Sequence, residues 1–339
     1  MSIFTNKFDD LRIAVEDETI SFEKFLIYFN GFSDSHLNLL QVLHWFERYV
    51  QDIWEKSNFT FIDVNKELED LIESIYTVLP FDDSGTVWFG GIIPSKNENN
   101  GSLSCIKTSF FSIYLIVAAS SGSFLAENSL FIAKMYDRLF YHVPTPVSFC
   151  EAFMENDTRL ISSMLAFLFV DKNHPGLSAN YKFVDLFVAL ILQFHGDAGN
   201  VFVEFLATET VMIPFILRTF KYLNGKLQIL KESYERLKNQ DNRKLLQNER
   251  TLFKRSSESS SQMVFNIDGI NGSHRITIDK RTESKDVAVI IKDNNFDIVK
   301  FFHDFYELVL DAHKKNRFPF KSDALVKCLH NFDCYITKA

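Results

Sequence analysis

Apolar residues recur at steps of three and four along most of the first 255 residues. Within residues 34–56, Leu43, Phe46 and Val50 fall on one helical face in this way. Short polar segments separate one apolar run from the next, a spacing that favours antiparallel helices stacked in layers. The same pattern predicts further helices at 65–79, 105–119, 126–140, 145–154, 158–170, 181–195, 199–223 and 225–254.

Three of these predicted helices, at 105–119, 158–170 and 181–195, are apolar on almost every side. A helix of this kind must be covered by protein on both sides. We therefore place the hydrophobic spine in the middle of the chain. The overall prediction is an all-α fold, in which stacked antiparallel helices form an armadillo- or HEAT-like superhelix.

The hydrophobic period changes from helical to alternating after a polar, serine-rich stretch. Residues 263–267, 274–279 and 286–291 are β-branched and partly alternating. Asn271-Gly272 lies between the first two runs and suits a tight turn, since both residues tolerate a positive φ. The sequence therefore predicts a small three-stranded β meander inserted near the C-terminus.

The last part of the chain predicts two helices, at 295–315 and 322–330, joined by an aromatic turn. Pro319 cannot continue the first helix. Phe318 and Phe320 are expected to project on different sides of the turn and to close the end of the helical stack as a hydrophobic clasp, and the alternative is a peptide-binding cleft at the same place.

Composition agrees with a chain built from long elements. Of the 339 residues, 46% are hydrophobic and 24% charged, which is typical of a globular protein. Phe is abundant (36 residues) while Gly and Pro are few (12 and 7), which favours long helices packed through aromatic side chains. We divide the chain into an α-helical repeat-like domain at 1–255, a polar linker with the meander at 256–294, and a C-terminal helical cap at 295–339.

No pattern of catalytic or metal-binding residues occurs. The sequence contains no glycine-rich phosphate loop, no HExxH and no GxSxG. The four cysteines have neither CxxC nor zinc-ligand spacing, which indicates reduced thiols of an intracellular protein. We therefore expect no enzyme activity, no catalytic or metal-ligating residues and no cofactor.

Membrane insertion is not expected from the sequence. The longest apolar runs, at 110–119 and 186–194, are half of the roughly 20 residues that a bilayer helix needs. A signal peptide begins with a basic segment that is followed by an apolar one, whereas the first residues of this chain include acidic ones. A cytoplasmic or nuclear location without a membrane partner is the resulting expectation.

Charge is distributed unevenly along the chain. The formal net charge is −8, which argues against a general polyanion binder, yet residues 218–255 carry 11 Lys or Arg against 4 Asp or Glu. Lys231 and Lys238 are expected to face away from Ile229, Leu230 and Tyr234. The candidate partner-binding residues in this stretch are Lys231, Arg236, Lys238, Arg243, Lys244, Lys254 and Arg255.

Two interpretations of the basic stretch stay open. It can be an ordinary solvated helix face, or a docking surface for an acidic protein or a nucleic-acid backbone. Exposed aromatic residues are not interleaved with its cations, which argues against stacking on single-stranded bases. The pairs Arg243-Lys244 and Lys254-Arg255 form a weak nuclear-import pattern.

Two stretches resemble the Lines family. FYELVLDAHKKNRFPFKSDALVKCL (305–329) resembles the family's short C-terminal domain, in which an apolar helix precedes basic residues, a Phe-Pro-Tyr turn and a Leu-rich helix. VFVEFLATETVMIPFILRTFKYL (201–223) resembles a run of the preceding helical domain, in which Phe-Leu, a Thr-Glu-Thr-like turn and a Leu-Leu-Arg-Tyr-Leu-Lys helix follow one another. The matching positions are Phe205, Leu206, Glu209, Thr210, Arg218, Lys221, Tyr222, Leu223, Arg317, Phe318, Pro319 and Phe320.

This chain departs from the family at Phe320, where Tyr is usual, and it is shorter than the animal members. Within the quoted run, Pro214 lies inside a helix at 209–223, where it must either kink the helix or mark its true first turn. The resemblance implies a non-enzymatic developmental regulator in nucleus and cytoplasm, which adjusts transcription-factor activity through protein contacts. The expected function is thus a helical scaffold that regulates transcription or signalling, and the alternative is a nucleic-acid-associated helical protein that uses residues 217–255.

Overall fold

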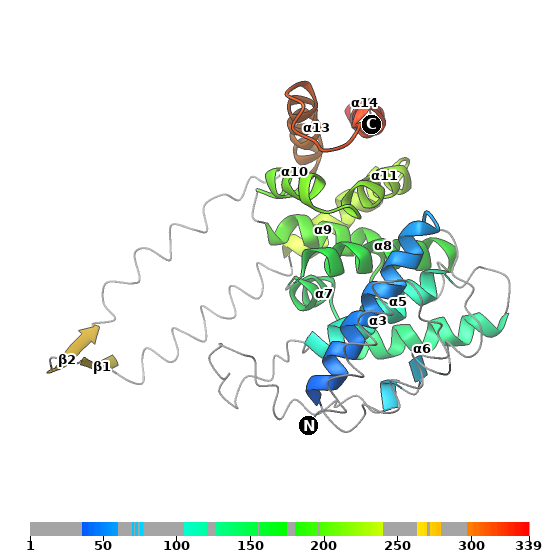
Figure 1. Ribbon diagram of the computed structural model, residues 1–339. Helices are drawn as coiled ribbons and strands as arrows, with labels where there is room; N and C mark the ends of the chain where they lie inside the picture. The colour runs from blue at the N-terminus through cyan, green and yellow to red at the C-terminus, as the bar shows by residue number, and fades with distance from the viewer. Residues whose placement is uncertain are drawn as a thin grey trace.

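The computed structural model is mainly helical, which confirms the predicted helical class. The helices are stacked broadly in chain order, from α3, α5 and α6 at one end to α13 and α14 at the other (Figure 1). The structure describes residues 36–59, 70, 72–73, 75–77, 105–120, 126–154, 156–174, 180–194, 197–239, 263–269, 272–278 and 297–338.

Most helices pack against partners that are close in the chain, but several contacts join distant segments. Helix α3 packs on α5, α5 on α8, α8 and α14 on α11, and α10 on α13. A further helix covers residues 227–239. The helix bounds are α3 (His36–Lys56), α5 (Cys105–Ser120), α6 (Ala126–His142), α7 (Pro146–Phe153), α8 (Asp157–Asn173), α9 (Phe183–Gln193), α10 (Ala198–Thr208), α11 (Met212–Leu223), α13 (Ile298–Lys314) and α14 (Asp323–Lys338).

Side-chain caps explain where several helices begin. Thr145 and Ser148 form a reciprocal capping box at the start of α7, and Pro146 occupies the first helical turn. Asn156 accepts from the backbone N–H of Arg159 and so caps α8. These local signals lie in the sequence next to the helices that they start.

The hydrophobic spine lies in the middle of the chain, as predicted. Every residue at 107–120 of α5 is buried, as is every residue at 183–191 of α9. Helix α8 is buried along most of its length. The prediction that these helices are covered on both sides is confirmed.

Two predicted boundaries were wrong. The helix predicted at 199–223 is divided into α10 and α11 around Glu209, and Pro214 is the third residue of α11. Pro214 therefore lies in a first turn, where its missing N–H costs nothing. Helix α8 continues past the predicted end at residue 170 to Asn173, and the buried carboxylate of Asp171 in this added part accepts bonds from the Phe183 N–H and the Tyr222 hydroxyl.

A β hairpin occupies the region of the predicted meander. Strands β1 (Met263–Gly269) and β2 (Gly272–Ile278) pair in antiparallel register, from Met263 opposite Ile278 to Gly269 opposite Gly272. Gly272 therefore belongs to a strand rather than to the turn. The third predicted strand, at 286–291, lies outside the described residues.

The turn between α13 and α14 differs from its prediction. The rings of Phe318 and Phe320 stack on each other with centroids 5.2 Å apart, instead of projecting on different sides. Both rings are half-buried and Pro319 is exposed. The chain reverses at Asn316, whose φ of 51° is left-handed. The clasp therefore covers the end of the stack only in part.

Helix α14 is longer than predicted, because it continues beyond residue 330 to Lys338. Its added turns carry Phe332 and Ile336 into the core. The side chain of Ser322, just before the helix, lies 2.8 Å from His313 Nδ1 and joins the ends of α13 and α14.

A second contact between α13 and α14 is sensitive to pH. His303 Nδ1 lies 3.0 Å from Asp333 Oδ1, and this hydrogen bond and the carboxylate charge raise the pKa of His303. Because the folded-state pKa lies above the unfolded value of about 6.5, this contact stabilises the fold fully below that value. We expect its contribution to be lost as the pH rises through the folded-state pKa.

Urea unfolding between pH 5.5 and 8.5 tests this prediction. His303→Gln and Asp333→Asn should each remove the same part of the pH dependence. A His303→Gln variant whose stability follows the wild-type pH profile would contradict the assignment to this pair.

Candidate protein-docking groove

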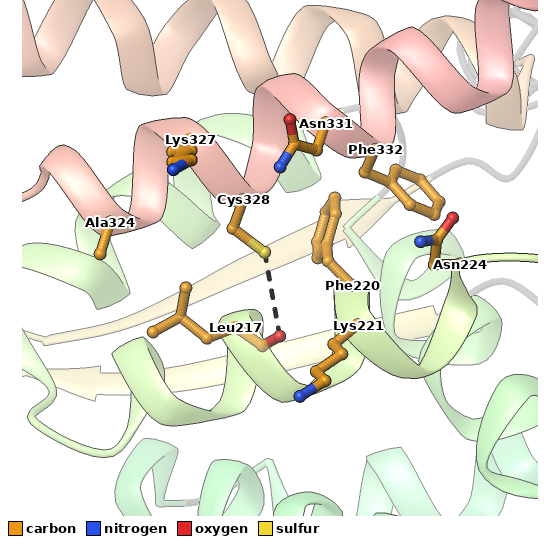
Figure 2. Close-up of a pocket in the computed structure, with 9 residues that line it drawn as sticks. All are labelled: Leu217, Phe220, Lys221, Asn224, Ala324, Lys327, Cys328, Asn331 and Phe332. Carbon is orange, nitrogen blue, oxygen red and sulfur yellow. Dashed lines mark hydrogen bonds between the residues drawn. The ribbon is translucent and has the colours of Figure 1, made fainter.

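A groove of about 390 Å³ lies between α11 and α14 (Figure 2). The two helices run in the same direction here, since Leu217 lies opposite Cys328 and Phe220 opposite Phe332. The residues that line the groove are Leu217, Phe220, Lys221, Asn224, Ala324, Lys327, Cys328, Asn331 and Phe332.

Helical periodicity places these side chains on two facing walls. The residues on the α11 side of the groove lie at steps of three, one and three, from Leu217 to Asn224, which directly follows the helix. Those on α14 follow the same kind of spacing from Ala324 to Phe332. Such steps bring side chains to one face of a helix, so each helix supplies one continuous wall.

The base of the groove is apolar, and two aromatic rings are in close contact there. Phe220 and Phe332 are buried, and their ring centroids are 4.9 Å apart. The Cys328 thiol lies 3.9 Å from the carbonyl oxygen of Leu217. Burial raises the pKa of this thiol, although the charge of Lys221 acts in the opposite direction. The thiol is therefore protonated near neutral pH and is not an activated nucleophile.

The rim of the groove is positively charged. Lys221 stands on the α11 wall and Lys327 on the α14 wall, and both are exposed (Figure 2). Neither ammonium group has an ion-pair partner among the residues that the structure describes. Exposed Asn224 and Asn331 add amide donors and acceptors. An apolar floor between two cationic walls suits a ligand with an apolar face and acidic flanks.

Cations of the predicted basic helix contact other side chains of the protein, which the sequence did not indicate. Arg236 pairs with the carboxylate of Asp185 on α9 and so contributes to packing between helices. The ammonium of Lys238 lies 5.3 Å from the centroid of the Tyr234 ring. Lys231 is half-buried. Of the seven predicted partner-binding cations, Arg243, Lys244, Lys254 and Arg255 lie outside the described residues.

One part of the predicted face was wrong. Leu230 and Tyr234 are buried as expected, but Ile229 is 48% exposed. Position 229 precedes the buried position 230, so it falls about 100° away on the helix and misses the face that packs on the core. None of the described cations of this helix lines the groove.

The residues that carry the family resemblance lie in different parts of the structure and do not form one site. Arg218 donates to the carbonyl of Asn58 at 2.9 Å and lies over the Phe169 ring. Tyr222 donates to Asp171 at 3.0 Å. Among the positions that carry the resemblance, only Lys221 lines the groove. Arg317 is exposed, and it lies in the same turn as Phe318, Pro319 and Phe320.

Sequence reasoning missed the α14 wall. Ala324, Lys327 and Asn331 follow helical spacing, but nothing in that spacing indicates which helix faces them. Their partner wall on α11 lies about 100 residues earlier in the chain.

A buried ion pair lies outside the groove. Arg159 on α8 donates from Nε and Nη2 to the two carboxylate oxygens of Glu47 on α3, both at 2.7 Å. Ser109 on α5 accepts from Arg159 at 2.6 Å and donates to Glu47 at 3.0 Å. This network joins three helices and is closed to ligands, so its role is structural.

Within the described ranges, no group of three or more His, Cys, Asp or Glu side chains could hold a metal ion. Cys150, Cys328 and Cys334 are free thiols. No single helix of the described part combines the length and apolar character needed to cross a membrane, and one sharply bent pair, α9 with α10, meets that test only jointly.

Comparison with known proteins adds no relative. The chain has no significant match to a protein-family model, a curated protein or a solved structure. The resemblance to Lines proteins consequently depends on the two quoted stretches, at 201–223 and 305–329.

Proposed function

We propose that this protein is a non-enzymatic scaffold that binds an acidic amphipathic helix of a partner protein in the α11–α14 groove. The observation that carries this proposal is the apolar floor of the groove between the exposed ammonium groups of Lys221 and Lys327. A helix laid in such a groove buries one apolar stripe and presents its flanks to both walls. Acidic flanks would complement the charge there.

The resemblance to Lines proteins suggests the setting of this interaction. Acidic segments that alternate with hydrophobic residues are typical of transcriptional activation domains. A transcription factor is therefore the partner class that we propose, with regulation of transcription or signalling as the outcome and the cytoplasm or nucleus as the location. We also retain an armadillo- or HEAT-like superhelix and a three-stranded meander as parts of this proposal.

The groove predicts a defined effect of charge reversal. A fluorescein-labelled synthetic helix with Leu at steps of three and four and Glu on both flanks serves as the probe. Replacing Lys221 and Lys327 together by Glu should weaken its binding about ten-fold, because two favourable rim contacts become repulsive. Fluorescence anisotropy at low and at physiological salt measures the change, and the wild-type affinity should fall as salt is added.

The matched control reverses two charges on the helix at 227–239, with Lys231→Glu and Lys238→Glu. This variant should bind the probe like the wild type. A larger loss in the control than in the groove variant would move the site to the predicted basic stretch and contradict the groove.

Alkylation of Cys328 should block the probe, whereas a Cys328→Ser chain treated in the same way should still bind it.

The alternative function, nucleic-acid association through residues 217–255, is supported by the excess of 11 cations over 4 acidic residues at 218–255. Charge reversal at Lys238, Arg243 and Lys244 should then abolish retention on nucleic acid together with its steep salt dependence. Wild-type retention after that reversal would exclude this function.

A further inference from the structure

The turn that joins α13 to α14 combines cations with apolar side chains. Within eight residues it carries four cationic side chains, all exposed: Lys314, Lys315, Arg317 and Lys321. Asp311 pairs with Lys315 at 2.7 Å. In the part of the chain that the structure describes, the other three cations have no ion-pair partner, and the nearest acidic residue that follows is Asp323.

Aromatic side chains stand between these cations. Phe318 and Phe320 are stacked and half-buried, and Pro319 between them is exposed. Their remaining exposed atoms and the proline ring form an apolar tip flanked by Arg317 and Lys321. We name residues 314–321 the basic-aromatic turn.

The scaffold fixes the shape of this turn. Arg317 N–H donates to the carbonyl of Ala312 at 3.0 Å, and Asn316 N–H donates to that of His313. Ser322 is buried and bonded to His313 at the far side of the turn. Because both ends are anchored, the backbone of the turn has a fixed shape between α13 and α14, the helices at one end of the stack (Figure 1).

We propose that the basic-aromatic turn docks on the surface of membranes that contain anionic phospholipids. A cluster of four or more Lys and Arg is attracted to a negatively charged lipid surface. Apolar and aromatic groups beside such a cluster can enter the headgroup boundary without spanning the bilayer. This proposal is independent of the α11–α14 groove, and it replaces the sequence-based expectation that the protein has no membrane partner.

A single-stranded nucleic acid fits the turn less well than a lipid surface. Proteins that bind single strands stack bases on free aromatic faces. Here Phe318 and Phe320 stack on each other, and each also packs on the core. Part of the surface of each ring is therefore covered by the other ring and by the core, which leaves less aromatic face for a base to stack on.

Co-sedimentation with vesicles tests the proposal on the full chain. The protein should sediment with phosphatidylcholine vesicles that contain phosphatidylserine, and not with phosphatidylcholine alone. Replacing Lys314, Arg317 and Lys321 by Gln should weaken the partition about 100-fold, since each cation near an anionic surface changes it about five-fold. Added salt should weaken wild-type binding in the same direction.

A control variant with Arg48→Gln, Lys134→Gln and Lys172→Gln removes the same number of exposed charges from α3, α6 and α8. It should sediment like the wild type, and circular dichroism checks that both triple variants are folded. Equal losses in the two variants, sedimentation with uncharged vesicles, or no sedimentation at all would overturn the proposal. So would turn-dependent binding of a labelled oligonucleotide without binding of vesicles.

Discussion

Replacing Arg159 by Leu is expected to lower the free energy of unfolding by about 3–5 kcal/mol. The Arg159 side chain is only 5% exposed and makes a bidentate contact with Glu47, whose side chain is 3% exposed. Without the guanidinium, a buried carboxylate would be left uncompensated. Urea or guanidinium denaturation at neutral pH measures the difference.

Two comparisons sharpen this prediction. Replacing Arg159 and Glu47 together by Leu should recover much of the loss, because no unpaired charge then stays buried. Arg138→Leu breaks the bidentate contact of Arg138 with Glu73, whose side chains are 20% and 30% exposed. That loss should be nearer about 1 kcal/mol. Equal losses for Arg138→Leu and Arg159→Leu would show that burial is not the cause.

The same pair gives an acid-sensitive contribution to stability. Burial acts to raise the pKa of Glu47, but the contacts with His44 and Arg159 outweigh it, so the pKa is lowered. The carboxylate therefore stabilises the fold above its unfolded value of about 4.3, and this contribution is lost as the pH falls through the folded-state pKa. The Arg159→Leu variant should not show that loss.

Phe220→Ala is the second change with a large expected effect, about 3–5 kcal/mol. Phe220 is 2% exposed, and its ring contacts Phe187, Phe302, Phe305 and Phe332 with centroids between 4.9 and 6.5 Å apart. These rings come from α9, α13 and α14, so the substitution leaves a cavity where they meet α11. Chemical denaturation measures the loss.

Tyr141→Ala provides the matched aromatic control, because Tyr141 on α6 is 81% exposed. It should change the free energy of unfolding by less than about 0.5 kcal/mol. A Phe220→Ala variant as stable as this control would mean that the C-terminal helices do not pack on α11 as described. Loss of groove binding in Phe220→Ala without loss of stability would instead assign the ring to the ligand.

Hydrophobic spacing was sufficient to predict the helices of the spine. Nine of the eleven residues of α9 are apolar, and so is every residue at 113–119 of α5, so burial on all sides of these stretches followed from the residues themselves. Boundaries were harder where a polar residue entered the core. The predicted helix at 158–170 stopped short of Asp171, because the bond of Asp171 to Tyr222, 51 residues away, is not visible in the local pattern.

The candidate site illustrates the same limit. Lys221 was singled out with Arg218 and Tyr222, but only the packing of α14 on α11 places Lys221 on the wall of a groove. Conversely, the sequence predicted that Arg236 is available to a partner, but in the structure it pairs with Asp185. Which cations stay available to a partner depends on neighbours from other helices.

The sequence alone determined the helical class and the buried middle helices. It also limited Pro214 to two places, a kink or the first turn of a helix. Each of these depends on residues within a few positions of one another, where the 3.6-residue period and local sterics act. The tertiary structure alone decided that Arg159 meets Glu47, that Phe318 stacks on Phe320, and that α14 completes the groove. Those contacts depend on how helices pack in space, and spacing along a single helix does not determine that packing.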